Sequence, residues 1–388
     1  MQDICMSVVL TSSCDLRCTY CINESGNDLV IEKEAKSEWE SAEEVIKCLE
    51  SISRVRNIRL IKFFGGEPML RDEMIKTIIL NKNKFNPNGD VQFALTTNAY
   101  REFSPDVLEI MMANKTIINI SLDGPEEIHN AARIAADKGN TFRAVLDNIE
   151  ILKKANYPFA LIGVLDERLV EHGTSISDIS RFARDISPIH KLDPVYELNA
   201  SQNGNGNNSN TLALLHQAKD LVHEVFQGIR SLNVEKYIFE NNIIRTMHNI
   251  VVNKEKKEVC SARYSLALFP NKSVYTCYNL ATDQHLVAKD ISKIDRKLLE
   301  RNIIEKQNLL GLENFPKEYR DVQFFGDYCP KENNFNSFAY LYRKNMIDCV
   351  TDELNKIIPG SPEHLSLLNY LTQGFNLDYF KGKVFGLK

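Results

Sequence analysis

The stretch that decides the fold is Cys14-Asp15-Leu16-Arg17-Cys18-Thr19-Tyr20-Cys21, which follows a short apolar run near the start of the chain. Three thiolates can hold a four-iron cluster and leave one iron without a protein ligand. An iron with an open position can bind and reduce another molecule, whereas a fully ligated cluster only passes electrons. Zinc is the alternative metal, but a structural zinc site needs four ligands, and the next cysteine or histidine is Cys48. The spacing therefore favours a cluster with an open iron.

Composition and charge agree with an intracellular globular protein. The 388 residues include 47 Lys and Arg and 52 Asp and Glu, a net charge of −5, so a nucleic-acid partner is not indicated. No apolar run approaches the roughly 18 residues of a membrane span, and the first residues lack a signal-peptide pattern. Nine cysteines in such a chain indicate metal ligands and reduced thiols. We expect a cytoplasmic protein with no membrane partner.

Apolar runs alternate with helical patterns through the first half of the chain. The predicted strands are 6–10, 58–64, 91–96, 117–122, 159–165 and 189–198. The predicted helices are 37–53, with a capping box at Ser37 and Glu40, then 71–81, 104–113, 125–136, 141–155 and 175–186. Near-continuous apolar strands are buried on both faces of a parallel sheet, and right-handed crossovers wind them into a full or partial barrel. We predict an α/β fold with functional residues at the carboxyl ends of the strands.

The C-x3-C-x2-C spacing, with Tyr20 before the last cysteine, resembles the signature of the radical S-adenosylmethionine (radical SAM) enzymes. The resemblance implies a partial (β/α)6 TIM-like barrel, a [4Fe-4S] cluster on Cys14, Cys18 and Cys21, and SAM as a cofactor. It also implies that the open iron binds SAM and that an electron from the reduced cluster breaks the sulfonium bond. The resulting 5′-deoxyadenosyl radical removes hydrogen from an unactivated carbon, while the protein supplies geometry, redox tuning and dryness.

Further matches to this superfamily follow the later strands. Gly65-Gly66-Glu67-Pro68 is its GGEP motif, whose glycines let the backbone approach a ligand and whose glutamate, by resemblance, meets the SAM amino group. Thr97 and Asn98 follow the third strand. The alternative for the GGEP segment is an ordinary strand-to-helix turn.

The stretch Ser121-Leu122-Asp123-Gly124-Pro125, with His129 and Arg133, resembles the subgroup that modifies peptides and proteins. By resemblance Ser121 and Arg133 help to hold the SAM carboxylate. The alternatives are a capped surface histidine at His129 and a solvated helix charge at Arg133. The SAM site implied by all these matches comprises Tyr20, Gly65, Gly66, Glu67, Pro68, Thr97, Asn98, Ser121, Asp123 and Arg133.

The remaining cysteines suggest a second metal site. Cys260 and Cys277 flank alternating apolar residues around a Pro-Asn-Lys-Ser turn, which predicts a hairpin that brings both thiols together. This segment resembles the start of a SPASM or twitch extension, although Lys272 stands where glycine is expected, and the dense cysteine run of a complete SPASM module is missing. The resemblance implies one auxiliary [4Fe-4S] cluster on Cys260, Cys277 and Cys329.

Cys349 is left as a fourth ligand of that cluster, or as a small buried hydrophobe within the helical pattern 338–358. Zinc bound by the four late cysteines is the alternative metal. Cys5 and Cys48 have no partner at ligand spacing, so we assign them to the core.

The polar run 199–210 cannot bury apolar surface and marks the end of the core. We predict four segments: a barrel over 1–198, a linker and helical bridge over 199–254, an auxiliary-cluster domain over 255–335, and a helical tail over 336–388. The bridge contains two predicted helices, 211–230 and 234–252.

By resemblance, auxiliary clusters of this type accompany enzymes that oxidise or cross-link peptide residues. We expect a maturase that installs a carbon–carbon or thioether cross-link in a ribosomally synthesised (RiPP) precursor peptide. The alternative enzymes are an anaerobic sulfatase-maturing enzyme that forms formylglycine, a peptide epimerase and a small-molecule dehydrogenase. A regulator that binds Fe-S or zinc is the non-enzymatic alternative, but it has no use for SAM motifs.

The expected partners follow from the same resemblance. They are the precursor peptide and an electron donor such as flavodoxin or ferredoxin. Because the chain begins almost on the first strand, we also expect leader binding by a separate protein, or by the helical bridge and tail. Catalytic residues are not assigned from the sequence.

Overall fold

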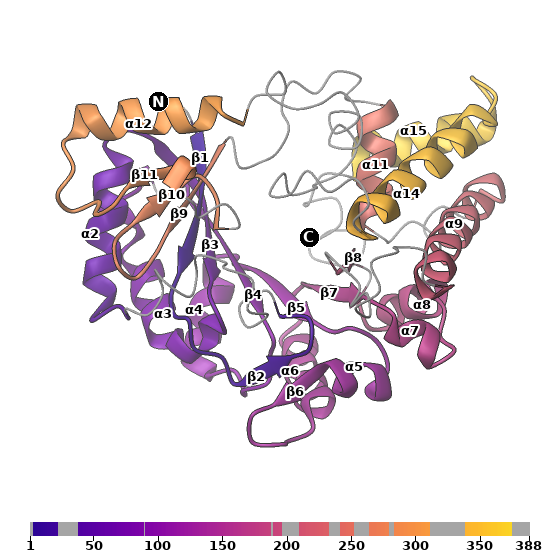
Figure 1. Ribbon diagram of the computed structural model, residues 1–388, viewed down its shortest axis with the longest axis horizontal. Coiled ribbons are helices and arrows are strands. Elements are labelled where there is room, and N and C mark those ends of the chain that lie inside the picture. Colours follow the sequence, from indigo (N-terminus) through magenta and orange to yellow (C-terminus); the bar gives the residue numbers. More distant parts are fainter. Residues whose placement is uncertain are drawn as a thin grey trace. The chain divides into compact units, whose positions relative to one another are not determined.

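The computed structural model describes residues 3–21, 38–88, 90–187, 189–195, 209–232, 241–251, 264–278, 283–310 and 338–374. The chain divides into two compact units (Figure 1). Unit 1 comprises Met1–Ser121, Ala132–Lys154 and Cys260–Asn314, and unit 2 comprises Leu122–Ala131, Ala155–Val259 and Phe315–Lys388. The domain boundaries expected from the sequence stay predictions.

Unit 1 carries the first strands of the predicted parallel sheet. β1 (Asp3–Val9), β3 (Asn57–Phe64), β4 (Gln92–Thr97) and β5 (Ile117–Ser121) pair in parallel in that order. The helices that connect or follow these strands are α2 (Ala42–Ser53), η1 (Pro68–Arg71), α3 (Asp72–Leu80), η2 (Lys82–Lys84), α4 (Pro105–Ala113) and α6 (Thr141–Lys154). The predicted strand–helix alternation is confirmed here, and it places the cysteine loop at the carboxyl end of β1.

α2 begins later than the capping box predicted. Residues 38–41 lie outside the helix, and its N-cap is Ser41, whose side chain makes no capping hydrogen bond. Trp39 Nε1 donates to Val9 O at 2.9 Å, and Glu38 accepts from Thr11 Oγ1 at 2.8 Å. These tertiary contacts hold residues 38 and 39 against the end of β1, so the predicted helix start near 37–40 is wrong, while Ser37 itself lies outside the described residues.

The later part of unit 1 extends the same sheet. β9 (Ser265–Leu268) pairs in parallel with β1, β10 (Val274–Tyr275) pairs antiparallel with β9, and β11 (Leu286–Ala288) completes the edge. In the chain, η5 (Asp283–His285) directly precedes β11, and α12 (Arg296–Asn308) comes after it. The predicted hairpin is confirmed, whereas its pairing with β1 was not foreseen.

The turn of that hairpin shows how Lys272 replaces the expected glycine. Lys272 has a φ of 67°, in the left-handed region that glycine favours, and its backbone N–H donates to Phe269 O at 2.8 Å. Its ammonium lies 2.9 Å from Glu44 Oε1 on α2. The turn therefore forms with lysine and gains an ion pair to the neighbouring helix.

A small second sheet joins the cysteine loop to a distant segment of unit 1. β2 (Leu16–Cys18) pairs antiparallel with β6 (Arg133–Ala135), and Cys18 lies opposite Arg133 in the register. The predicted helix 125–136 is therefore shorter: α5 spans Glu126–Ala132, and the last residues form β6. Backbone pairing with the cysteine loop overrides the helical pattern here.

Unit 2 contains the last predicted strands and most of the predicted bridge. β7 (Phe159–Leu165) and β8 (His190–Pro194) pair in parallel. Besides most of α5, the helices described in this unit are α7 (Arg168–Glu171), α8 (Ile176–Ile186), α9 (Ser209–Arg230), α11 (Asn241–Val251), α14 (Phe338–Asn355) and α15 (Pro362–Gly374). α9 packs along α14.

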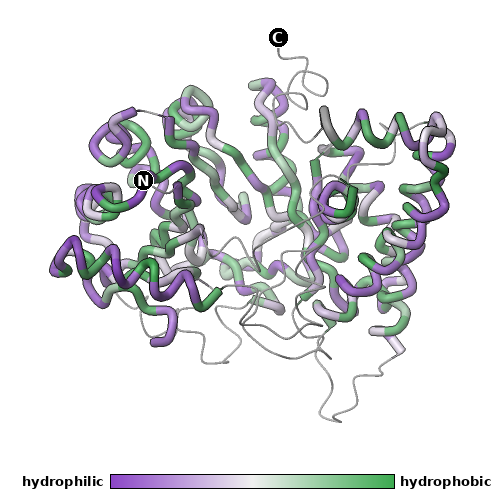
Figure 2. Tube along the Cα trace, turned by 90° about the horizontal axis from the view of Figure 1, so that it is seen from above, coloured by the Kyte–Doolittle hydropathy of each residue, from purple (hydrophilic) through white to green (hydrophobic). Residues whose placement is uncertain are grey.

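Many helices carry alternating bands of hydrophilic and hydrophobic residues, as expected of helices with one buried face (Figure 2). In α2 the buried side includes Val45, Leu49 and Ile52. Among the described residues, no helix combines the length and apolar character needed to cross a membrane.

Candidate active site

The cysteine loop, residues 10–21, is fixed to its surroundings by backbone hydrogen bonds. Thr19 N donates to Ala132 O at 3.0 Å, and Ala136 N donates to Asp15 O at 2.9 Å, so the loop is held on both sides of β2. Cys14, Cys18 and Cys21 are partly buried thiols on this loop, and none of them is in a disulfide. The structure thus presents all three predicted ligands at the end of β1.

The donor set around Cys14 fits an iron-bound thiolate. Its Sγ accepts hydrogen bonds from Leu16 N at 3.4 Å and from Asn98 Nδ2 at 3.7 Å. With no iron bound, burial raises the pKa of Cys14 to about 12, and the neighbouring carboxylates of Glu67 and Asp15 add to the shift. Iron binding would displace the thiol proton, because the ligand is the thiolate.

No three His, Cys, Asp or Glu side chains within the described ranges gather around a position for a single metal ion. The thiolates of a four-iron cluster bind separate irons, so they need not meet at one point. The three thiols of the cysteine loop are therefore suited to a cluster by their donor type and by the rigidity of the loop.

The two glycines of the GGEP motif are required by the cysteine loop itself. A Cβ atom on Gly65 would lie 2.3 Å from Thr11 O, and one on Gly66 would lie 2.2 Å from Ser13 O. Gly66 N donates to Thr11 O, and Glu67 N donates to Ser13 O, both at 2.9 Å. The close backbone approach that we expected toward a ligand is thus made toward the loop that carries the cysteines.

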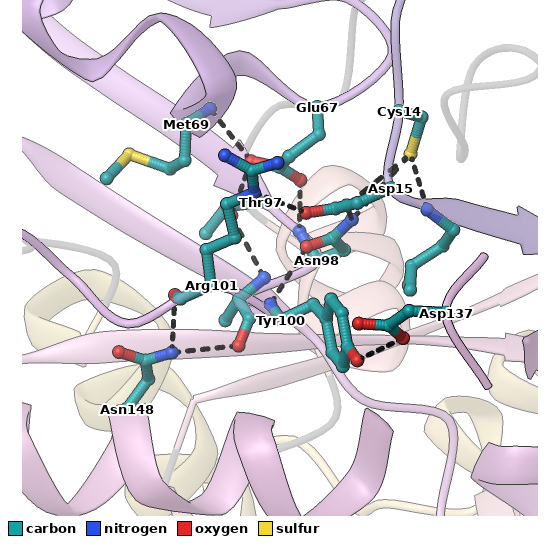
Figure 3. A network of polar contacts seen from close by, with 12 residues as sticks. Cys14, Asp15, Glu67, Met69, Thr97, Asn98, Tyr100, Arg101, Asp137 and Asn148 are labelled. Atoms are coloured by element: carbon teal, nitrogen blue, oxygen red, sulfur yellow. Dashed lines mark hydrogen bonds and ion pairs between the residues drawn. The ribbon is translucent and has the colours of Figure 1, made fainter. Parts of the chain in front are cut away.

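Glu67 links the ends of β3 and β4 (Figure 3). Its Oε1 accepts from Thr97 Oγ1 at 2.7 Å and from Met69 N at 2.9 Å, and its Oε2 accepts from Asn98 N at 2.7 Å. The residue is 2% exposed, and burial raises the pKa of its carboxyl to about 7 while these hydrogen bonds oppose the rise. In this structure Glu67 organises the site, and its contact with SAM stays a prediction.

Replacing Glu67 with leucine is expected to lower the free energy of unfolding by about 3 kcal/mol or more, since three buried donors lose their acceptor at roughly 1–3 kcal/mol each. Glu67→Gln is the matched variant, because it keeps the shape and one side-chain acceptor and should cost much less. Urea unfolding of both variants measures the difference. A Glu67→Leu variant as stable as wild type would contradict the assigned contacts.

Several polar residues of the site were missed from the sequence. Asp15 accepts from Asn98 Nδ2 at 2.7 Å and from Arg101 Nε at 3.2 Å. Tyr100 donates to Asp137 Oδ1 at 2.5 Å, and this hydrogen bond raises the pKa of Tyr100 to about 12. Two features of the sequence could have identified these residues. Asp15 lies between two of the loop cysteines, and Tyr100 and Arg101 come just after the end of a strand.

Asn148 on α6 supports the loop after β4. Its Nδ2 donates to Ala99 O at 2.9 Å and to Arg101 O at 2.8 Å, and its Oδ1 accepts from Phe103 N at 2.9 Å. Because each bond is made to the backbone, this asparagine fixes the course of the loop. Asn98, Tyr100 and Arg101 therefore lie on a segment that Asn148 holds by hydrogen bonds to its backbone (Figure 3).

Arg133 and Tyr20 lie together beside the cysteine loop. The Arg133 guanidinium carbon is 5.5 Å from the centre of the Tyr20 ring, which is a cation–π distance. Arg133 is buried and belongs to β6, so the alternative of a solvated helix charge is wrong. Ser121, the last residue of β5, is also buried. The SAM contacts of these residues and of Pro68 stay predictions.

Asp123 and His129 lie in the segment Leu122–Ala131, which belongs to unit 2. Asp123 is buried, and its Oδ1 accepts from Val164 N at 3.0 Å. His129 Nδ1 accepts from Asp123 N at 3.3 Å, and its side chain is fully buried, so the surface alternative for this histidine is wrong. Asp123 thus holds the start of its turn to β7, and its predicted SAM contact is untested.

Of the four late cysteines, the structure describes Cys277 and Cys349. Cys260 and Cys329 lie outside the described residues, and Cys277 follows β10 in unit 1 as a half-buried thiol that is not in a disulfide. Cys349 is buried on α14, 4.0 Å from Lys219 O and 3.9 Å from His223 Nε2 on α9. These helix contacts suit the buried-thiol alternative for Cys349, while its assignment as a ligand stays a prediction. Cys48 is buried on α2, as expected of a core residue.

Comparison with known proteins gives a superfamily match over residues 8–186 and several similar enzymes. The model of the radical SAM superfamily matches residues 8–186. The chain is similar to the cysteine-type anaerobic sulfatase-maturating enzyme of Clostridium novyi (strain NT), with 24% identity over 307 residues, 76% of this chain and 78% of that protein. The enzyme of the same description from Clostridium perfringens (strain 13, type A) is 28% identical over 227 residues, 56% of this chain and 59% of that protein.

A solved structure extends the comparison to the fold. Native anSMEcpe with bound AdoMet and Cp18Cys peptide superimposes with a TM-score of 0.68 at 17% identity, over 95% of this chain and 99% of that chain. At this identity the likeness concerns the fold, and it confirms the predicted α/β architecture of radical SAM type. Residues 8–186 therefore match the radical SAM superfamily, and this match together with the similarity to named maturating enzymes indicates that the protein is an enzyme.

Proposed function

We propose that this protein is a peptide-modifying enzyme of the SPASM/twitch subgroup that takes hydrogen from a residue of a peptide or protein. Cys14, Cys18 and Cys21 would hold the [4Fe-4S] cluster, which together with SAM supplies a 5′-deoxyadenosyl radical when bound. The observation that carries the proposal is the rigid cysteine loop, whose backbone is packed against the GGEP glycines and whose Cys14 thiol receives two N–H donors.

Peptides are the favoured substrate class for a separate reason. The similar proteins are named cysteine-type sulfatase-maturating enzymes, and the similar solved structure contains a bound peptide. These names support a cysteine-containing peptide as the substrate here. A thioether cross-link and a formylglycine are the two products that use such a cysteine.

The thioether cross-link is our first candidate because the chain lacks the dense late cysteine run expected of the sulfatase-maturing family. Formylglycine is the second candidate, favoured by the similarity to the clostridial enzymes. In both reactions an electron must leave the substrate after hydrogen removal. We propose that Cys260, Cys277 and Cys329, with Cys349 or another group as the fourth ligand, hold an auxiliary cluster that accepts it.

The test uses the anaerobically reconstituted protein with SAM, a chemical reductant and the peptides encoded beside its gene. We expect 5′-deoxyadenosine together with a peptide whose cysteine has changed. Mass spectrometry separates the products: a thioether loses hydrogen only, a formylglycine exchanges sulfur for oxygen and also loses two hydrogens, and an epimer keeps its mass. Peptides with alanine in place of cysteine are the matched control. SAM cleavage with every cysteine peptide left unchanged would contradict the proposal.

The proposed partners are tested in the same system. A flavodoxin or ferredoxin in place of the chemical reductant should support product formation. Binding of the peptide's leader segment alone, with and without a candidate leader-binding protein, shows whether this chain recognises its substrate unaided.

A further inference from the structure

We propose that Asn98 and Asp15 together set the reduction potential of the cluster held by Cys14, Cys18 and Cys21. The inference rests on the proposed cluster at these cysteines, and it makes Asn98 and Asp15 positioning residues for the electron transfer that cleaves SAM. Asn98 is the hydrogen-bond donor of the pair, and Asp15 is its fixed negative charge (Figure 3).

The amide of Asn98 has a defined orientation. Its Oδ1 accepts from Tyr100 N at 2.9 Å, which leaves the NH2 group facing the cysteine loop. That group lies 2.7 Å from Asp15 Oδ1 and 3.7 Å from Cys14 Sγ. Because only the NH2 group of an asparagine donates, Asn98 presents N–H to both the thiol sulfur and the carboxylate.

The donor is also held in place. Asn98 is 7% exposed, and its backbone N–H donates to the buried carboxyl of Glu67 at 2.7 Å. The residues that follow are fixed by Asn148, which bonds to Ala99 O and Arg101 O. Water cannot readily replace a donor in such a position, and a hydrogen bond in a poorly solvated site is electrostatically strong.

Asp15 supplies charge next to a ligand. It directly follows Cys14, its side chain is 12% exposed, and its Oδ2 lies 3.2 Å from Arg101 Nε. The Arg101 side chain is 62% exposed, so solvent and salt screen its charge more than they screen that of Asp15. The carboxylate is therefore only partly neutralised, and its field reaches the thiolate of Cys14.

These two groups act on the cluster with opposite signs. Reduction adds negative charge to the cluster, and an N–H donor to a thiolate sulfur stabilises that charge and raises the potential. A nearby carboxylate repels the added charge and lowers the potential. Removing the Asn98 donor should therefore make reduction harder, and removing the Asp15 charge should make it easier.

The experiment compares Asn98→Leu with Asp15→Asn in the reconstituted full chain without SAM. Leucine matches the shape of asparagine and lacks the donor, while asparagine at position 15 keeps an acceptor and lacks the charge. A potentiometric titration followed by electron paramagnetic resonance measures the midpoint potential of each variant. We expect shifts in opposite directions, each corresponding to about a tenfold change in the reduction equilibrium, which is about 59 mV for one electron.

Asn119→Leu is the matched control, because the Asn119 amide on β5 donates to Leu95 O at 3.1 Å, a backbone oxygen within the same sheet. It should leave the potential unchanged. Unshifted potentials in both test variants, or shifts in the same direction, would overturn the inference. Loss of iron from both would show that the pair only clamps the loop and would also overturn it. A wild-type chain that binds no [4Fe-4S] cluster overturns the proposed function itself, which separates the two failures.

Discussion

Replacing Cys14, Cys18 and Cys21 together with alanine is expected to remove roughly four irons per chain and to abolish 5′-deoxyadenosine formation. The three thiols are the only cysteines of the cysteine loop, and without the cluster no open iron remains to bind and reduce SAM. The measurements are the iron content after anaerobic reconstitution and the yield of 5′-deoxyadenosine with reductant and SAM.

The matched control replaces Cys5 and Cys48 with alanine. Cys48 is buried on α2, and Cys5 lies within β1, so this pair changes thiol content without touching the cysteine loop. It should retain iron and SAM cleavage. If the triple variant still cleaved SAM reductively after purification, the assignment of the loop as the radical site would be wrong.

The strands could be predicted because their signal is local. Near-continuous apolar runs ended in turn residues, and the runs 6–10, 58–64, 117–122 and 159–165 correspond to β1, β3, β5 and β7 within a residue or a few. The cysteine loop and the GGEP motif were then placed by the rule that function follows the carboxyl ends of parallel strands.

The errors arose where long-range contacts overrode a local pattern. Ser37 and Glu40 form a capping-box pattern, but Trp39 and Glu38 bond to residues at the end of β1 and delay the helix. The residues of β6 continue a helical pattern, but their backbone groups pair with the cysteine loop. A single sequence contains no record of such partners, which lie far away along the chain.

The same limit applies to the candidate site. Asp15 and Arg101 are separated by 86 positions and meet only after β1 and β4 are brought together. The glycines at 65 and 66 were singled out by resemblance. The structure shows that glycine is needed there because the backbone of Thr11 and Ser13, far away along the chain, approaches closely. The sequence therefore identified residue types for the chemistry, and the structure shows which neighbours orient them.

Changing Cys260 and Cys277 together to alanine is expected to lower the iron content to roughly four per chain, because a four-thiolate cluster that loses two ligands is not retained. SAM cleavage should survive, since the cysteine loop on β1 is unchanged. Formation of the modified peptide should fall, because the electron left on the substrate after hydrogen removal has lost its acceptor.

Iron content, 5′-deoxyadenosine and modified peptide are measured on the same preparation. Cys349→Ala, made alone, is the informative companion. A buried core thiol, packed against Lys219 and His223, predicts iron content equal to wild type, whereas a cluster ligand predicts lower iron content. Iron equal to wild type in the double variant, or zinc in the wild-type protein by elemental analysis, would contradict the auxiliary cluster. Because β9 pairs with β1, a fall in SAM cleavage in the double variant would instead indicate that the hairpin supports the cysteine loop.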